Sequence, residues 1–362
     1  MKYVSLFSGI GGFEKGLLEV FPDAECVGFC EINKRAVKTY TAHFPKHELI
    51  AKDIREFKWT KELSEKHGVV DLVVAGFPCQ DLSTLSNLRS DPSQRQCGVS
   101  GEKSGLVTEL VRLLGEIKPK WFVVENVGRS KQTDRDKISK LLGVRPVSVD
   151  ARYFSAQKRN RLFWTNFPVV EPTRFTRDTP TLHSILDTKE NAMTMKLTPK
   201  ATAFMSKFHK GRCRYDDRFE CVDSDTSKAH TLTSRGDIPR SVIVDKRFSP
   251  PLLREFTVRE MERMQCFPDG WVGDISMKKA KKMLGNAVNV RVVRYIMQQL
   301  LDHNNALRED QHPQQNDKKR HHNTLEALAS SQNKKLCRIT AYFQKAAPTA
   351  TKKADAKEGT IK

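Results

Sequence analysis

Short apolar segments alternate with amphipathic segments over the first 165 residues of the chain. The apolar segments have the length of buried strands, and they predict strands at Tyr3–Phe7, Cys26–Cys30, Val69–Ala75, Trp121–Val124, Val147–Val149 and Leu162–Trp164. The amphipathic segments predict helices at Glu14–Val20, Asn33–Phe44, Gly105–Ile117 and Arg135–Leu142. Such an alternation predicts an α/β fold with a doubly wound, mostly parallel sheet that binds its ligands at the carboxyl ends of the strands.

The alternation ends near residue 168, where Pro, Thr, Arg, Lys and His become frequent. Only short strands are predicted there, at Thr231–Thr233 and Ser241–Val244. Helical periodicity returns at Thr257 and continues to about Leu301, and the polar composition after Asp302 predicts a disordered tail. We therefore predict four segments, which are an α/β domain (1–167), a smaller basic domain (168–255), C-terminal helices (256–301) and a basic tail (302–362).

Charge and cysteine content narrow the class of protein. The net charge of the 362 residues is +20, which favours a polyanionic partner, above all nucleic acid, over a protein that is merely basic. No apolar run approaches the roughly 20 residues of a membrane span, and we expect no signal peptide. The eight cysteines include no Cys-x-x-Cys pair, so we expect reduced thiols in the cytoplasm or nucleus and no metal site.

A glycine-rich loop, Phe7-Ser8-Gly9-Ile10-Gly11-Gly12-Phe13, follows the first predicted strand and opens a helix. Glycines let a ligand approach the backbone closely, and the helix N-terminus offers free N–H groups. Glu31 ends the second strand and is placed to hold ribose hydroxyls, while Asp53 lies where a third strand would end and is placed to accept from an adenine amino group. This pattern fits a dinucleotide or S-adenosylmethionine, and the alternative is a tight turn without a ligand.

Cys79 follows the buried strand Leu72–Ala75 in the run Gly76-Phe77-Pro78-Cys79-Gln80. Gly76 and Pro78 break the strand, which predicts that the thiol is displayed at its carboxyl end as a nucleophile. Glu125 follows the next strand, so the two groups are expected to act as a nucleophile and acid pair on an aromatic ring. The alternatives are a buried structural cysteine and a helix-capping carboxylate.

Two arginines occur in Gln157-Lys158-Arg159-Asn160-Arg161, which leads into a predicted strand. A spacing of two residues in a strand sends both side chains to the same side. Arginines so placed are suited to fix a carboxylate and to bind an oxygen or a phosphate, although a solvated charge run is the alternative.

Together these motifs resemble the DNA (cytosine-5)-methyltransferase family over residues 1 to about 301. The resemblance extends to Thr257-x-Arg259-Glu260-x-x-Arg263-Met264-Gln265-Cys266-Phe267-Pro268 and to Leu284-Gly285-Asn286-Ala287-Val288, and six motifs occur in the order of the family. The stretch from Ser155 to Pro168 is similar to the animal de novo branch, while Gln80 and the run Gln265–Pro268 are closer to the general family.

The resemblance implies a Rossmann-like fold that binds S-adenosylmethionine, with a target-recognition domain at 168–255 and C-terminal helices that return to the catalytic domain. It implies that Cys79, Glu125, Arg159 and Arg161 are catalytic. Residues implied to bind the cofactor are Phe7, Ser8, Gly9, Ile10, Gly11, Gly12, Glu31, Ile32, Asp53, Ile54, Pro78, Leu106, Asn286 and Val288. Residues implied to contact double-stranded DNA are Gln80, Ser83, Arg212, Arg214, Arg235 and Arg240.

The implied reaction transfers a methyl group to carbon 5 of a cytosine flipped out of the duplex, through a covalent adduct with Cys79. Three alternatives remain open, namely an RNA cytosine-5 methyltransferase, a catalytically inactive DNA-binding regulator of the same fold and, more distantly, a dehydrogenase. The Cys-Phe-Thr-containing signature of the tRNA-modifying relatives does not occur in the target region.

The tail carries Leu336-Cys337-Arg338-Ile339-Thr340-Ala341-Tyr342-Phe343. The spacing of Ile339, Tyr342 and Phe343 resembles the motif that docks on the proliferating-cell nuclear antigen (PCNA) sliding clamp, although Leu336 stands where that motif has Gln. The alternative is an incidental apolar patch. Clamp binding would place the chain in the nucleus of a eukaryotic or virus-infected cell, and we expect a monomer.

Overall fold

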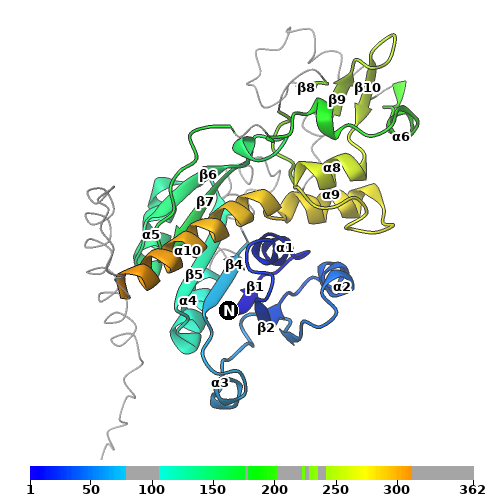
Figure 1. Ribbon diagram of the computed structural model, residues 1–362. Coiled ribbons are helices and arrows are strands. Elements are labelled where there is room, and N and C mark those ends of the chain that lie inside the picture. Colours follow the sequence, from blue (N-terminus) through cyan, green and yellow to red (C-terminus); the bar gives the residue numbers. More distant parts are fainter. Residues whose placement is uncertain are drawn as a thin grey trace, which may run out of the picture. The chain divides into compact units, whose positions relative to one another are not determined.

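The computed structural model describes residues 1–78, 106–175, 178–199, 201, 222–224, 228–234 and 242–311 (Figure 1). All of these residues belong to one compact unit, Met1–Gln315. Several predicted site residues lie outside the described residues, and their roles stay predictions: Cys79, Gln80, Ser83, Arg212, Arg214, Arg235, Arg240, Ile339, Tyr342 and Phe343. Within the described residues, no helix has the length and apolar character required to span a membrane.

A seven-stranded sheet forms the centre of the unit, with the strand order β3-β2-β1-β4-β5-β7-β6. Its strands are β1 (Lys2–Leu6), β2 (Glu25–Cys30), β3 (Leu49–Ala51), β4 (Leu72–Gly76), β5 (Trp121–Val127), β6 (Pro146–Asp150) and β7 (Asn160–Thr165). The neighbours from β3 to β5 are parallel, while β7 is antiparallel to both β5 and β6. The predicted doubly wound, mostly parallel sheet is therefore confirmed. Its order reverses at β1 and β4, which is where such sheets bind ligands.

Helices cover the sheet and continue past it (Figure 1). They are α1 (Gly12–Leu18), α2 (Lys34–His43), α3 (Lys61–His67), α4 (Leu106–Ile117), α5 (Gln132–Leu142), α8 (Val258–Met264), α9 (Met277–Asn286) and α10 (Val290–Gln311). Helices α1 and α10 pack so closely that a side chain on Gly16 would come within 2.6 Å of the Val290 carbonyl oxygen. Helix α10 also continues past the predicted start of the tail at residue 302.

The region after β7 contains a second, three-stranded sheet of order β10-β9-β8. Its strands are β8 (Val222–Asp223), β9 (Val242–Asp245) and β10 (Leu252–Glu255), and the short helix α6 (Lys189–Thr194) contacts β10. Turns of 3-10 helix occur at Ala151–Tyr153 and His183–Ile185.

The strand predicted at Thr231–Thr233 is wrong, because this segment is irregular. Side chains form hydrogen bonds with the backbone N–H and carbonyl groups of Leu232, which a neighbouring strand would otherwise bind. The Leu232 N–H donates to Gln157 Oε1 (3.2 Å), and Arg159 Nη1 donates to the Leu232 carbonyl oxygen (2.7 Å). With both groups satisfied in this way, the segment has no ladder to join.

A fully buried ion cluster joins β9, β10 and α8. The Arg254 guanidinium donates to Asp245 Oδ2 (2.9 Å) and, as a fork, to Glu260 Oε1 (2.7 Å) and Oε2 (2.8 Å). None of the three side chains is exposed. Burial alone would raise the pKa of Asp245, but hydrogen bonds from Arg247 and Arg254 outweigh it and hold the pKa at about 2. The guanidinium therefore compensates two buried carboxylates at once.

Replacing Arg254 by methionine is expected to lower the free energy of unfolding by about 3–5 kcal/mol, because the buried Glu260 loses its counter-charge and the buried Asp245 keeps only Arg247. Urea denaturation measures the change. Arg247→Met is the matched control: its side chain is 20% exposed and Asp245 keeps Arg254, so a loss on the order of 1 kcal/mol is expected. If Arg254→Met lowers the free energy of unfolding no more than Arg247→Met does, the buried cluster does not stabilise the fold beyond an ordinary partly exposed ion pair.

A second buried polar group lies beneath the glycine-rich loop. Glu14 on α1 is fully buried, and the Tyr40 hydroxyl on α2 donates to its Oε1 atom (3.1 Å). The same hydroxyl lies 2.9 Å from His47 Nδ1 and 3.9 Å from the sulfur of Cys26. Burial raises the pKa of Glu14 from 4.5 to about 7 and outweighs its hydrogen bonds. The carboxyl is thus held near the midpoint of its titration at neutral pH.

Replacing Glu14 by glutamine is expected to stabilise the protein at pH 8 by up to about 3 kcal/mol and to leave it unchanged near pH 4.5. A raised folded-state pKa means that stability falls as the pH rises from the unfolded value of 4.5 to about 7, and then levels off. Glutamine keeps the acceptor for Tyr40 without the charge. Urea denaturation of both proteins at several pH values tests this, and a pH-independent difference between them would contradict it.

Candidate active site

The loop between β1 and α1 turns sharply at residues with left-handed backbone angles. Phe7, Gly9 and Gly11 adopt left-handed φ angles of 55°, 58° and 85°. The space beside Gly9 is open, because an added Cβ there would meet no atom within 4 Å. Gly12 in contrast lies against Val288, whose Cγ1 atom would be 2.9 Å from an added Cβ. The structure thus brings together the predicted cofactor residues Gly12 and Val288, which are far apart in sequence.

Glu31 extends from the end of β2 toward this loop. Its Oε2 atom accepts from the Gly9 N–H (2.9 Å) and its Oε1 atom from the Asn33 N–H (2.7 Å). Burial raises the pKa of Glu31, while these N–H donors oppose the change. Each carboxylate oxygen has a second lone pair for a ribose hydroxyl. The neighbouring Ile32 is 64% exposed, so it offers an apolar surface beside the carboxylate.

The other predicted cofactor residues have varied surroundings. Asp53 accepts the backbone and side-chain N–H groups of Arg55, and these hydrogen bonds lower its pKa. Ile54 and Ser8 are buried, Asn286 is exposed at the end of α9, and Leu106 is the first residue of α4. Asp53 is therefore kept ionised as an acceptor, but its described contacts do not join it to the glycine-rich loop.

Glu125 is fixed by two strands. It lies inside β5, which continues to Val127 beyond the predicted end, and it is directly opposite Gly76 of β4. From β7, Arg161 Nε lies 3.0 Å from Glu125 Oε1, with both side chains less than 15% exposed. Burial raises the pKa of Glu125, and the charges of Arg161 and then Arg159 oppose that rise. The raised pKa suits a carboxyl group that donates a proton.

Asn126 joins β5 to the segment that precedes the predicted nucleophile. Its Nδ2 atom donates to the Phe77 carbonyl oxygen (3.1 Å), and Asn126 is 2% exposed. Phe77 is buried and Pro78 is partly buried. The first described segment ends at Pro78, which directly precedes the predicted nucleophile Cys79.

Arg159 donates to backbone carbonyl groups, whereas Arg161 pairs with the carboxylate of Glu125. The Arg159 guanidinium donates to the carbonyl oxygens of Leu232 (2.7 Å), Gly285 (3.0 Å) and Ala287 (2.8 Å), and the residue is 2% exposed. These bonds hold the end of α9 and the residues directly after it, with Asn286 and Val288, against the segment around Leu232. The predicted catalytic role of Arg159 stays a prediction, since the contacts in hand are those of a positioning residue.

Two contacts that position the site were not predicted, although Gln265 belongs to one of the motifs on which the family resemblance rests. Trp271 Nε1 donates to the Ile10 carbonyl oxygen (2.9 Å) of the glycine-rich loop, and its ring stacks on His43 at 3.6 Å. Gln265 donates to the carbonyl oxygens of Leu284 (2.6 Å) and Ala287 (3.3 Å). No local pattern marks Trp271, because its partner is 261 residues away.

The sheet order, the glycine-rich loop and the carboxylate at the end of β2 define an S-adenosylmethionine-dependent methyltransferase. The family of C-5 cytosine-specific DNA methylases matches residues 1–302. The chain belongs to this family, and it is an enzyme whose methyl donor is S-adenosylmethionine.

Similar proteins cover most of the chain. The type II methyltransferase M.DsaV of Dactylococcopsis salina is 28% identical over 324 residues, and the match covers 84% of this chain and 86% of that protein. M.HpaII of Haemophilus parainfluenzae is 24% identical over 336 residues, with coverages of 83% and 89%.

Solved structures share the fold. A DNMT2 mutant from Spodoptera frugiperda has a TM-score of 0.62 at 20% identity, and the match covers 83% of this chain and 99% of that one. The methyltransferase EhMeth of Entamoeba histolytica has a TM-score of 0.63 at 17% identity, with coverages of 83% and 98%.

Proposed function

We propose that the chain methylates carbon 5 of cytosine in double-stranded DNA through a covalent adduct between Cys79 and a flipped base. The observation that carries this proposal is the Glu125–Arg161 pair. Glu125 lies opposite Gly76, and Gly76 comes three residues before Cys79 in the sequence. A buried carboxyl group with a raised pKa, on the strand beside the one that leads to Cys79, fits attack on a ring that must gain a proton at nitrogen. The net charge of +20 supports a nucleic-acid substrate.

In the proposed reaction, the Cys79 thiolate forms a bond to carbon 6 of the cytosine. Glu125 donates a proton to ring nitrogen 3, so that electrons move toward carbon 5 and charge does not accumulate on the ring. Carbon 5 then takes the electrophilic methyl group that S-adenosylmethionine would supply, as the bond from this methyl group to the sulfonium sulfur breaks and its electron pair stays on that sulfur. A base then removes the proton from carbon 5, the sulfur–carbon 6 bond breaks to restore the thiolate, and the proton on ring nitrogen 3 returns to Glu125.

The contacts of Arg161 support the part that we propose for it. Its Nε atom is bound to Glu125 Oε1, and one Nη atom donates to the Asn160 carbonyl oxygen (2.8 Å). The guanidinium therefore orients the carboxyl group and leaves further N–H donors for the oxygen at carbon 2 of the base. Glu31 and the Gly9–Gly12 loop hold the methyl donor, while Asn126 fixes the backbone that precedes Cys79.

Transfer of labelled methyl groups by the purified full chain tests the proposal, with double-stranded DNA and tRNA as separate substrates. We expect label in DNA, and bisulfite sequencing to place it at carbon 5 of cytosine. Label in tRNA alone would favour the RNA methyltransferase, and no transfer to either would favour a catalytically inactive regulator.

DNA that contains 5-fluorocytosine tests the adduct separately. Fluorine cannot leave carbon 5 as a cation in the way that a proton does, so the bond from sulfur to carbon 6 is expected to persist. A protein–DNA band that survives denaturation and requires S-adenosylmethionine is the expected result. Methyl transfer to normal DNA without such a band would contradict the covalent step.

A further inference from the structure

The glycine-rich loop is braced by a side chain from the far end of the sequence. The Ile10 carbonyl oxygen, in the middle of the loop, accepts the indole N–H of Trp271 (2.9 Å). Both residues are buried, so water does not compete for this hydrogen bond. Because Ile10 and Gly11 share one peptide plane, the bond also fixes the direction of the Gly11 N–H, which donates to the Ser8 carbonyl oxygen (3.1 Å). Trp271 therefore sets the orientation of one peptide unit of the loop.

Aromatic side chains of α2 and of the residue that follows it hold the indole ring in place. His43, at the end of α2, stacks on the indole with centroids 3.6 Å apart and ring planes 5° apart. Its Nε2 atom lies 2.7 Å from the Trp271 carbonyl oxygen. Phe44 meets the indole edgewise at 6.0 Å, and its ring occupies the place that a side chain on Gly11 would take. These contacts fix the plane of the indole and thus the direction of its N–H.

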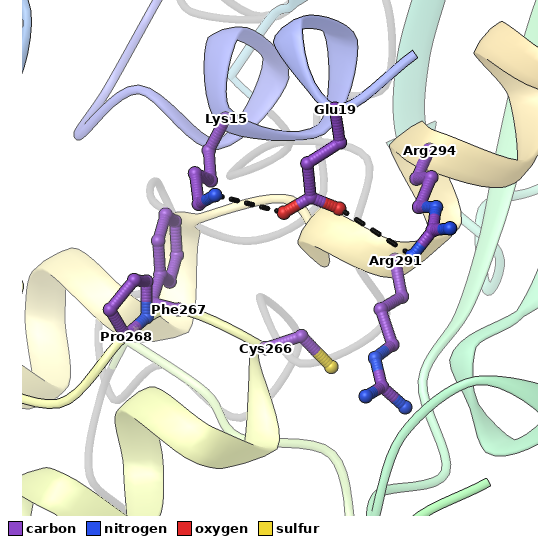
Figure 2. A pocket seen from close by; sticks show the side chains of 7 residues that line it. All are labelled: Lys15, Glu19, Cys266, Phe267, Pro268, Arg291 and Arg294. Atoms are coloured by element: carbon purple, nitrogen blue, oxygen red, sulfur yellow. Dashed lines mark ion pairs between the residues drawn. The ribbon is translucent and has the colours of Figure 1, made fainter. Parts of the chain in front are cut away.

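Phe267 connects the indole to the start of α1. Its ring extends toward α1 (Figure 2), and its Cζ atom would lie 3.3 Å from an added Cβ on Gly12. The same ring packs on the indole of Trp271, with centroids 5.1 Å apart. An aromatic cluster therefore lies against the loop and the start of α1, and its members are His43, Phe44, Phe267 and Trp271.

The backbone of Trp271 is anchored as well as its ring. Trp271 lies in the turn after α8, between two residues whose N–H groups donate to the carboxylate of Glu262 on α8. These donors are Gly270 (2.8 Å) and Val272 (2.9 Å), and Glu262 is 1% exposed. The indole N–H is therefore presented from a fixed support, which preorganises the loop that it binds.

We propose that Trp271 is a positioning residue for the methyl donor, because it holds the glycine-rich loop in the shape that binds S-adenosylmethionine. Without this hydrogen bond, the glycines would allow the loop several backbone conformations, and binding would have to offset the loss of that freedom. Trp271 acts through Ile10 and needs no contact with the donor. The proposal rests on the methyl donor of the family and does not depend on DNA as the substrate.

Trp271→Phe removes the N–H donor and keeps an aromatic ring in the cluster. Titration calorimetry of the full chain with S-adenosylmethionine, without nucleic acid, is expected to show binding about five- to tenfold weaker than that of the wild type. Trp164→Phe is the matched control, because Trp164 is fully buried and its indole N–H donates to Ser139 Oγ (3.0 Å) between β7 and α5. This control is expected to bind S-adenosylmethionine like the wild type.

Thermal unfolding separates positioning from a general loss of structure. Both tryptophan variants lose one indole hydrogen bond, so similar decreases in unfolding temperature are expected, but only Trp271→Phe should weaken binding of the donor. Wild-type affinity in Trp271→Phe, or an equal loss of affinity in Trp164→Phe, would overturn the proposal. Methyl transfer to DNA has no part in these measurements, so the proposed function can fail without this proposal failing.

His43→Ala is a second variant, which removes the ring stacked on the indole and leaves the indole N–H in place. His43 is exposed, so this variant is expected to fold. We expect it to bind S-adenosylmethionine about threefold more weakly. In the double variant with Trp271→Phe, the two losses should not add, because both act through one hydrogen bond. If Trp271→Phe does not fold, wild-type affinity in His43→Ala would by itself overturn the proposal.

Discussion

Replacing Cys79 by alanine is expected to abolish methyl transfer, with a fall in rate of about 10⁴-fold or more. The thiolate forms the bond that makes carbon 5 nucleophilic, and no other group in the proposed site supplies that bond. Single-turnover transfer of labelled methyl groups to DNA measures the change. Affinities for S-adenosylmethionine and DNA are expected to stay within a few-fold of the wild type, because the glycine-rich loop and Glu31 are untouched.

Cys97→Ala is the control for this prediction, since Cys97 is another cysteine of the same sequence region and has no predicted role. It should keep normal transfer. A Cys79→Ala protein that still transfers methyl groups at a tenth of the wild-type rate would contradict a covalent mechanism at this residue. Loss of cofactor binding would instead indicate a structural role for Cys79.

Replacing Glu125 by glutamine is expected to lower the rate of methyl transfer by about 10²- to 10⁴-fold with little effect on stability. Glutamine has the same shape and still accepts from Arg161 Nε, but it cannot deliver a proton to ring nitrogen 3. The wild-type rate is expected to fall as the pH rises through the raised pKa of Glu125, because the protonated donor is then lost. The variant should lack this dependence.

Single-turnover rates over a range of pH measure both effects. Glu65→Gln on α3 is the control, because its side chain is 67% exposed and remote in sequence from every predicted motif. A Glu125→Gln protein with at least half of the wild-type rate, or with an unchanged pH profile, would remove Glu125 from the chemistry. A large drop in unfolding temperature would assign it a structural role.

Much of the fold could be predicted because its strands are apolar runs of the right length. The predicted strands of the first domain correspond to β1, β2, β4, β5, β6 and β7, with shifts at the ends. The start of β4 is one such shift: Val69 is apolar yet 77% exposed, so hydropathy placed the strand three residues early. Helix α3 was not predicted, since it buries no residue and hence has no apolar period.

The C-terminal boundary shows the limit of composition as a guide. The residues after 302 are polar, which favoured a disordered tail, yet α10 continues to Gln311. His303 packs its ring edgewise against Trp121, with ring centroids 5.1 Å apart, and Leu307 packs on the core. Two tertiary contacts thus support the last turns of α10, beyond the point where composition placed the start of the tail.

Within the site, the sequence predicted the residues whose side chains have a role in the chemistry. It did not predict the contacts by which other side chains hold the backbone in place. The two arginines were expected to fix a carboxylate, and the structure places Arg161 Nε 3.0 Å from Glu125 Oε1. Glu14 was missed, although its place beside Phe13 and Leu17 on the apolar face of α1 is a usable signal. The backbone contacts of Arg159 and Gln265 depend on tertiary structure alone, so no spacing rule reveals them.

The closure of the glycine-rich loop by Trp271 has a consequence for how the chain folds. The hydrogen bond to Ile10 spans 261 residues, and the packing of Gly16 on Val290 spans a similar stretch. Contacts between residues so far apart in the sequence form late in folding, because closing a very long loop costs conformational entropy. During synthesis, α1 and the glycine-rich loop therefore lack these contacts until Trp271 and Val290 have been made. We expect the cofactor pocket of an emerging chain to be complete only after that point.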